Sequence, residues 1–170
     1  MTAQDDDDRS LYWSEFTVSA HLDAEGLLHV RERQGMVLDG AWNGCERRFQ
    51  ARAGQELDLQ SIERIDPATG ERTPLVEGDL DRVDEYAWQE GALRWRNRLE
   101  SDPPFADDEI VYELTYTIAP VLLTTEEGGS RFAHDFAFAD RDGVIERFQV
   151  DLTLDSAWTS TVGNHIREAM

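Results

Sequence analysis

Residues 11–22 alternate between apolar and polar side chains, and this period of two constrains the fold more than any other feature of the sequence. One parity holds Tyr12, Phe16, Val18, Ala20 and Leu22, and the other holds Trp13, Glu15, Thr17, Ser19 and His21. Successive side chains of a strand point to opposite faces, so the pattern predicts a half-buried strand. The turn residues at 23–26 and the apolar positions Leu28 and Val30 predict a second strand running back beside it.

The same reasoning predicts further strands along the chain, at 41–51, 57–65, 92–99, 109–119, 130–139 and 144–154. Clusters of Gly, Pro and Asp separate these segments and favour turns. No long stretch has helical spacing, although 79–88 fits either a helical turn or an irregular strand. We therefore predict an all-β fold, an antiparallel two-sheet β-sandwich of immunoglobulin-like or jelly-roll-like type with short helical turns at most.

The sandwich is expected to span residues 11–158. Residues 1–10 are expected to form a flexible acidic tail, and 159–170 a linker or a short helix. The expected core combines the apolar parities of the strands: Phe16, Val18, Leu28, Val30, Phe49, Leu93, Trp95, Tyr112, Leu114, Tyr116, Phe136, Phe148, Val150 and Leu152.

The net charge of the chain limits the classes of molecule that it is expected to bind. The chain of 170 residues has 36 acidic and 16 basic residues, and its formal net charge is −20. A field this negative repels nucleic-acid phosphates and anionic lipid, so neither is an expected partner. No apolar stretch approaches the ~18 residues of a membrane span. We expect a monomer whose partner is a protein or a component of the cell envelope.

Arg94, Arg96 and Arg98 recur at every second residue of the segment 92–99. If that strand pairs with 109–119, the three arginines face the glutamates of its outer parity, and each such pair contributes ~0.2–1 kcal/mol. Internal pairing is the favoured interpretation, and a binding site for an anionic ligand is the alternative. Four acids close to the arginines argue against the anion site: Glu100, Asp102, Asp107 and Asp108.

His134 and Glu146 are the second pair of weak candidates for a site. They lie on facing parities of the predicted hairpin between 130–139 and 144–154, so a cross-strand contact is feasible. A buried histidine beside a carboxylate is a common arrangement for general-base chemistry. The simpler interpretation is a histidine that is satisfied near the end of a sheet.

The remaining chemical motifs are weak. Cys45 lies in "NGCERRF" without a neighbouring base, so we interpret it as a small core residue rather than a nucleophile. The sequence "DRDG" at 140–143 lacks the further ligands of a calcium loop and fits a hairpin turn. Phosphate-loop, dinucleotide and zinc motifs do not occur. We therefore predict no catalytic residue, no metal and no cofactor.

Three segments together resemble an uncharacterised family of predicted bacterial and archaeal membrane proteins, whose N-terminal domain lies outside the cytoplasm. They are "GLLHVRERQGMVLDGAWNGCERRF", "IVYELTYTI" and "HDFAFADRDGVIERFQVDLTLDSAW". The resemblance covers roughly residues 12–158 and consists of strand and turn patterns. It implies a β-sandwich ectodomain that a membrane span follows in full-length members. This chain departs from the pattern by lacking the signal sequence, the span and the closing proline, which Trp158 and Thr159 replace.

The function expected from these observations is a non-catalytic, extracytoplasmic binding or interaction module of a membrane-anchored protein. One alternative is a hydrolase- or transglutaminase-associated domain that uses His134 and Glu146. The other is a cation-binding structural module. The acidic start and the short, poorly patterned end at 159–170 are what excision from a longer anchored protein would leave.

Overall fold

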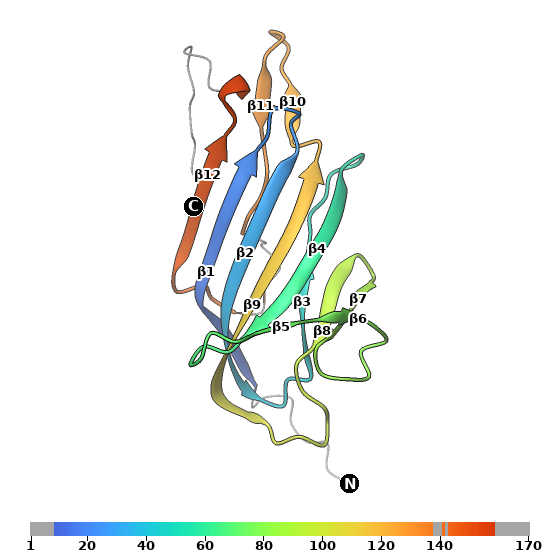
Figure 1. Cartoon of the computed structure of the whole chain (residues 1–170), viewed down its shortest axis with the longest axis vertical. Coiled ribbons are helices and arrows are strands. Elements are labelled where there is room, and N and C mark those ends of the chain that lie inside the picture. The colour runs from blue at the N-terminus through green and yellow to red at the C-terminus, as the bar shows by residue number, and fades with distance from the viewer. Residues whose placement is uncertain (1–8, 138–140, 142, 159–170) are drawn as a thin grey trace.

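Strands form nearly the whole described chain and assemble into two β-sheets packed against each other, which confirms the all-β prediction (Figure 1). The computed structural model describes residues 9–137, 141 and 143–158. The first sheet has six strands, in the order β12 (Phe148–Leu154), β1 (Ser10–Leu22), β2 (Leu28–Gly40), β9 (Phe105–Ala119), β4 (Glu56–Ile65) and β5 (Arg72–Pro74). The second has four, in the order β3 (Gly44–Arg48), β8 (Ala92–Arg96), β7 (Glu85–Gln89) and β6 (Val76–Glu77).

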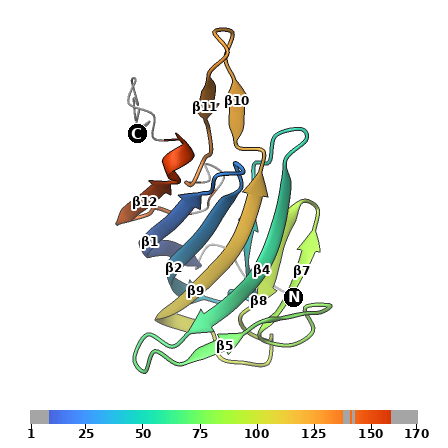
Figure 2. The same cartoon turned by 45° about the horizontal axis from the view of Figure 1, so that its top comes forward.

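A separate hairpin of β10 (Leu122–Thr124) and β11 (Ser130–Phe132) projects beyond the end of the sandwich (Figure 2). A 3₁₀ turn at Ser156–Trp158 follows β12. Most neighbouring strands are antiparallel, as predicted, but β12 runs parallel to β1 and β6 runs parallel to β7. The predicted tail and linker fall largely on residues 1–8 and 159–170, outside the described chain, and β1 already begins at Ser10.

The predicted alternation of the first strand holds only beyond a β-bulge. The register with β2 shifts between Trp13 and Glu15, so one extra residue is inserted into β1. An extra residue reverses which parity faces the core. Trp13 and Phe16 are therefore both buried, and the placement of Trp13 on the outer face was wrong.

Most of the predicted core is buried between the sheets. The deeply buried members are Phe16, Val18, Leu28, Val30, Leu93, Trp95, Tyr112, Leu114 and Tyr116, whereas Phe49, Phe136 and Val150 are partly buried. Phe148 and Leu152 are 44% and 36% exposed, which corrects their assignment to the core. Both lie on β12, an edge strand of the first sheet, whose one strand neighbour among residues 9–137 and 143–158 is β1.

Two strand pairings that the sequence interpretation considered do not form. The segment 92–99 does not pair with 109–119, because β8 lies between β3 and β7 in the second sheet. The hairpin of 130–139 with 144–154 does not form either, because β11 pairs with β10 and β12 pairs with β1. Within the ambiguous region 79–88, the chain turns and then enters β7 at Glu85.

Candidate functional site

The three arginines of the ladder occupy three different environments. Arg94 donates to Glu46 Oε2 at 3.0 Å and to Glu90 Oε2 at 3.2 Å. Arg96 donates from Nε to the carbonyl oxygen of Leu80 at 2.7 Å. The arginines are thus engaged internally, as favoured, but the glutamates of β9 do not supply the partners.

Arg98 lies beyond the end of β8 and is buried, so its predicted outward orientation was wrong. Its Nη2 donates to Asn43 Oδ1 at 2.6 Å, and its Nη1 donates to the carbonyl oxygen of Asp102. These bonds fasten the loop after β8 to the segment before β3. The contacts of Arg98 are therefore those of a structural residue.

His134 and Glu146 are not brought together. His134 is partly buried and stacks edge-on against Phe136, with ring centroids 4.7 Å apart, while Glu146 is exposed. His134 Nε2 is buried and has no hydrogen-bond partner within the described part of the chain. Burial, together with the positive charge of Arg47, lowers the pKa of His134 to about 4. This histidine is neutral near pH 7, and no carboxylate among the described residues forms a hydrogen bond with it that would orient it as a base.

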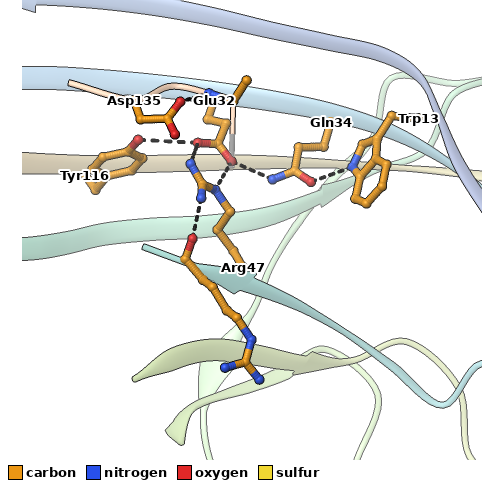
Figure 3. Close-up of polar contacts among 8 residues, drawn as sticks. Trp13, Glu32, Gln34, Arg47, Tyr116 and Asp135 are labelled. Carbon is orange, nitrogen blue, oxygen red and sulfur yellow. Dashed lines mark hydrogen bonds and ion pairs between the residues drawn. The ribbon is translucent and has the colours of Figure 1, made fainter. Parts of the chain in front are cut away.

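The centre of the sandwich holds an ion pair that the sequence reasoning missed. Glu32 of β2 and Arg47 of β3 connect the two sheets, with Arg47 Nε donating to Glu32 Oε1 at 2.9 Å and Nη2 donating to Oε2 at 3.2 Å. Their side chains are 0% and 3% exposed. Gln34 Nε2 and Tyr116 Oη also donate to the Glu32 carboxylate, at 2.6 and 3.3 Å (Figure 3).

The electrostatics of the pair favour the charged form of the arginine. Burial acts to lower the pKa of Arg47, but the Glu32 carboxylate beside it outweighs this effect and raises the pKa. Burial and the same carboxylate raise the pKa of Tyr116 well above its usual value, which keeps the phenol protonated as a donor. Fully hydrogen-bonded and closed to solvent, the pair is an inter-sheet clamp rather than a reactive group.

A pattern in the sequence could have identified this clamp. Glu32 and Gln34 lie on the same parity as Leu28, Val30 and Met36, so two polar residues interrupt an apolar face. Arg47 likewise lies on the parity of Cys45 and Phe49. Charged residues on buried parities of two different strands indicate an internal ion pair.

A cleft of about 850 Å³ lies beside β3, and we call it the arginine cleft. Apolar and aromatic side chains of both sheets and of two connecting segments line it, namely Leu11, Trp13, Met36, Trp42, Cys45, Leu80 and Trp95. The charged residues of the lining are Glu46, Arg48, Arg94, Arg96 and Arg141, and Asn43 and Gly44 complete it. Trp42 forms part of the wall, and the guanidinium of Arg9 lies 4.8 Å from the centre of its ring.

The charge of this lining is opposite in sign to that of the whole protein. Four arginines and one glutamate border the cleft, whereas the chain carries a net charge of −20. The single Glu46 serves two of the arginines, because Arg48 donates to its Oε1 at 2.6 Å and Arg94 to its Oε2 at 3.0 Å. Arg94 also pairs with Glu90, which lies outside the lining, so these two arginines have two carboxylates between them. The positive charge of Arg96 is not compensated in this way, because its Nε donates to the neutral carbonyl oxygen of Leu80.

The buried clamp reaches the cleft at two points. Trp13 forms part of the cleft lining, and its Nε1 donates to Gln34 Oε1 at 2.9 Å, while Gln34 in turn donates to Glu32. At the other end, Arg47 Nη1 donates to the carbonyl oxygen of Arg48, a second lining residue. Figure 3 shows the chain of contacts from Trp13 through Gln34 to Glu32. The cleft lining is therefore held by a fixed polar network.

Cys45 has the character of a core residue, as predicted. Burial raises the pKa of the Cys45 thiol to about 12, and Asn97 Nδ2 donates to its sulfur at 3.2 Å. A thiol that stays protonated is a poor nucleophile. In the described part of the chain, no group of three or more His, Cys, Asp or Glu side chains is placed to hold a metal ion. The predicted turn at 140–143 includes residues 140 and 142, which lie outside the description.

Comparisons with known proteins identify no family for this chain. No protein-family model matches the chain, and no curated protein matches it. A solved structure from Parabacteroides distasonis ATCC 8503, described as a "putative protease", is similar with a TM-score of 0.35 and 10% identity. The similarity covers 64% of this chain and 22% of that protein, and a likeness this low carries no argument. No helix among the described residues is long and apolar enough to cross a membrane.

Proposed function

We propose that this chain is a non-catalytic binding module that takes up an anionic ligand in the arginine cleft. The observation that carries the proposal is the reversal of charge, since four arginines and one glutamate line a cleft of about 850 Å³ in a protein of net charge −20. Positive groups in a concave, partly apolar site concentrate the field and attract anions. A domain that is otherwise strongly negative repels the same anions from the rest of its surface.

The hydrolase alternative gains no support from the geometry of its two residues. His134 and Glu146 share no hydrogen bond or ion pair, and burial keeps His134 neutral near pH 7. General-base catalysis needs the base within hydrogen-bond reach of its substrate and a group that orients it. We therefore give the binding role to the cleft and none to this pair.

The location that we propose is outside the cytoplasm, on a protein anchored in a membrane, and the resemblance of three sequence segments supports it. The natural gene would then encode ~20 consecutive apolar residues downstream of residue 170 and a leader with 7–15 apolar residues upstream of the domain. Reading the complete gene tests this part. A stop codon directly after codon 170 and no leader upstream would contradict it.

Mapping of amide chemical shifts by NMR tests the binding role. The probes are a glutamate-rich peptide, a sulfated oligosaccharide and, as the matched control, a lysine-rich peptide of equal length. We expect at least one anionic probe to shift the amides of Gly44, Glu46 and Arg94, and this effect to weaken in Arg48→Gln. Shifts produced only by the lysine-rich peptide, or anion-induced shifts confined to other surfaces, would overturn the proposal.

A further inference from the structure

The inference deepens the proposed function and rests on it, because it names the class of ligand and the way it binds. β3 is the outermost strand of the second sheet, and β8 is its one strand neighbour in the described chain. An edge strand presents a row of backbone groups that are free to pair with another strand.

The register shows which backbone groups of β3 face away from β8. Asn97 N donates to the carbonyl oxygen of Asn43 at 3.3 Å, one residue beyond the Gly44–Arg96 pair that ends the β3–β8 ladder, and hydrogen-bonded pairs alternate along an antiparallel ladder. Cys45 and Arg47 therefore direct their backbone groups toward β8. The amides of Gly44, Glu46 and Arg48 point the other way, toward the side on which the cleft lies.

A second hydrogen bond supports this assignment. The carbonyl oxygen of Arg96 accepts a bond from Asp84 N at 3.1 Å, on the β7 side of β8. Arg96 is the direct partner of Gly44, so this carbonyl turns away from Gly44 and the two form a non-hydrogen-bonded pair. All three residues with outward amides line the arginine cleft.

The cleft surface offers different chemistry to the two faces of an added strand. The inner face of the first sheet contributes Leu11, Trp13 and Met36 as an apolar floor. Arg48, Arg94 and Arg96 lie on the opposite parity of β3 and β8 from the buried Trp95. A peptide in the cleft would thus place every second side chain on the apolar floor and the alternate ones beside guanidinium groups.

We propose that the arginine cleft binds an extended acidic peptide segment, which adds as an additional strand to the edge of β3 that has no strand neighbour among the described residues. Backbone hydrogen bonds to Gly44 and Glu46, and to the amide of Arg48, whose carbonyl oxygen already accepts a bond from Arg47, provide the affinity for strand addition. The alternation of apolar and acidic side chains provides the specificity. β3 has five residues, so a peptide of similar length fills the edge.

The test uses capped hexapeptides of alternating glutamate and valine, titrated by calorimetry against the whole chain. The matched control replaces each glutamate with lysine. Two further peptides carry N-methyl groups on every second residue, one on each parity. Methylation removes backbone donors without changing side chains, so only the parity that faces β3 contributes to strand pairing.

We expect the glutamate peptide to bind at least tenfold more tightly than the lysine peptide. Methylation should weaken binding at least tenfold on one parity and less than threefold on the other. Arg48→Gln should weaken binding of the glutamate peptide several-fold, whereas Arg31→Gln, whose side chain is 66% exposed on β2 of the first sheet, should leave it unchanged.

Two results would overturn strand addition. If both methylated peptides bind as the parent does, the cleft binds acidic chains through side chains alone, and the proposed function stands without the strand. If the glutamate peptide does not shift the amides of β3 while the sulfated oligosaccharide does, the ligand is anionic but not a peptide. Failure of every anionic probe would remove the proposed function as well.

Discussion

Removal of Arg47 alone should destabilise the domain more than removal of both charges of the clamp. In Arg47→Met, the Glu32 carboxylate loses both of its bonds to the guanidinium, at 2.9 and 3.2 Å. It keeps two neutral donors, Gln34 at 2.6 Å and Tyr116 at 3.3 Å. A buried charge left without its counter-ion costs ~3–5 kcal/mol.

That magnitude is readily measurable in a chain of this size. For domains of 150–250 residues, 1 kcal/mol shifts the melting temperature by ~2–4 °C, so Arg47→Met should melt roughly 6–20 °C lower. Equilibrium unfolding in urea gives the free energy directly, provided that the slope m is unchanged. The control is Arg31→Met, because Arg31 is 66% exposed and 3.8 Å from Glu113, and an exposed pair is worth ~0–1 kcal/mol.

The double variant Glu32→Gln/Arg47→Met decides whether the cost comes from the stranded charge. It holds no buried ion, and removing both members of a buried pair is often close to neutral. We expect the double variant to be more stable than Arg47→Met by at least ~1 kcal/mol. It should fold even if the single variant does not. A double variant no more stable than the single one would refute the reasoning, because packing would then explain the loss.

Three further outcomes follow from the described contacts. Burial lowers the pKa of His134 to about 4, below the ~6.5 of an unfolded chain, so its contribution to the free energy of unfolding is fully present above pH ~6.5 and is lost on acidification. By pH 4 the free energy of unfolding of the parent should fall by roughly 3 kcal/mol more than that of His134→Asn. Equal losses for the two proteins in urea titrations would contradict this. Arg98→Ala leaves the acceptors on Asn43 and Asp102 without their charged donor and should lower the free energy of unfolding by ~1.5–3 kcal/mol. Arg94→Ala removes only exposed pairs and should lower it by at most ~1 kcal/mol. Similar values for both variants would show that burial is not decisive. Salt screens the self-repulsion of a chain with net charge −20, because the Debye length falls from ~10 Å at 0.1 M to ~3 Å at 1 M NaCl. The melting temperature should therefore rise over this range. A flat or falling curve would show that local ion pairs outweigh the net repulsion.

Local alternation predicted the fold class because it depends on which side of a strand is buried. The segments around β1, β2, β4 and β9 were placed correctly for this reason. The bulge at Trp13–Glu15 was not predictable, since one inserted residue leaves each flanking stretch with an ordinary alternation. Its effect is large, however, because it brings Trp13 into the interior and to the cleft.

The pairing of strands was much harder to predict than their positions. Arg94 forms its ion pair with Glu46, which is 48 residues earlier in the chain, because β8 pairs with β3 and not with β9. Alternating charges on a strand show that it has an outer face, but they fit any partner strand that carries acids. The cleft was unpredictable for a related reason, since it depends on which strand remains without a neighbour on one side. The clamp, in contrast, is predictable from the sequence, because Glu32 and Arg47 are charged residues on the apolar parities of their strands.

The two adjacent arginines of β3 have different roles in this interpretation, because Arg47 stabilises the fold and Arg48 contributes to binding. Arg47 faces inward, and Glu32 neutralises its charge within the core, so it has no charge to offer a ligand. Arg48 faces outward, and its side chain is 43% exposed beside the carboxylate of Glu46, so its guanidinium is accessible to a ligand. Neutralising Arg47 should therefore reduce stability while the cleft lining is still charged. Neutralising Arg48 should reduce affinity for acidic ligands while stability changes by at most ~1 kcal/mol. The alternation of a single strand thus allows the two properties to be altered separately.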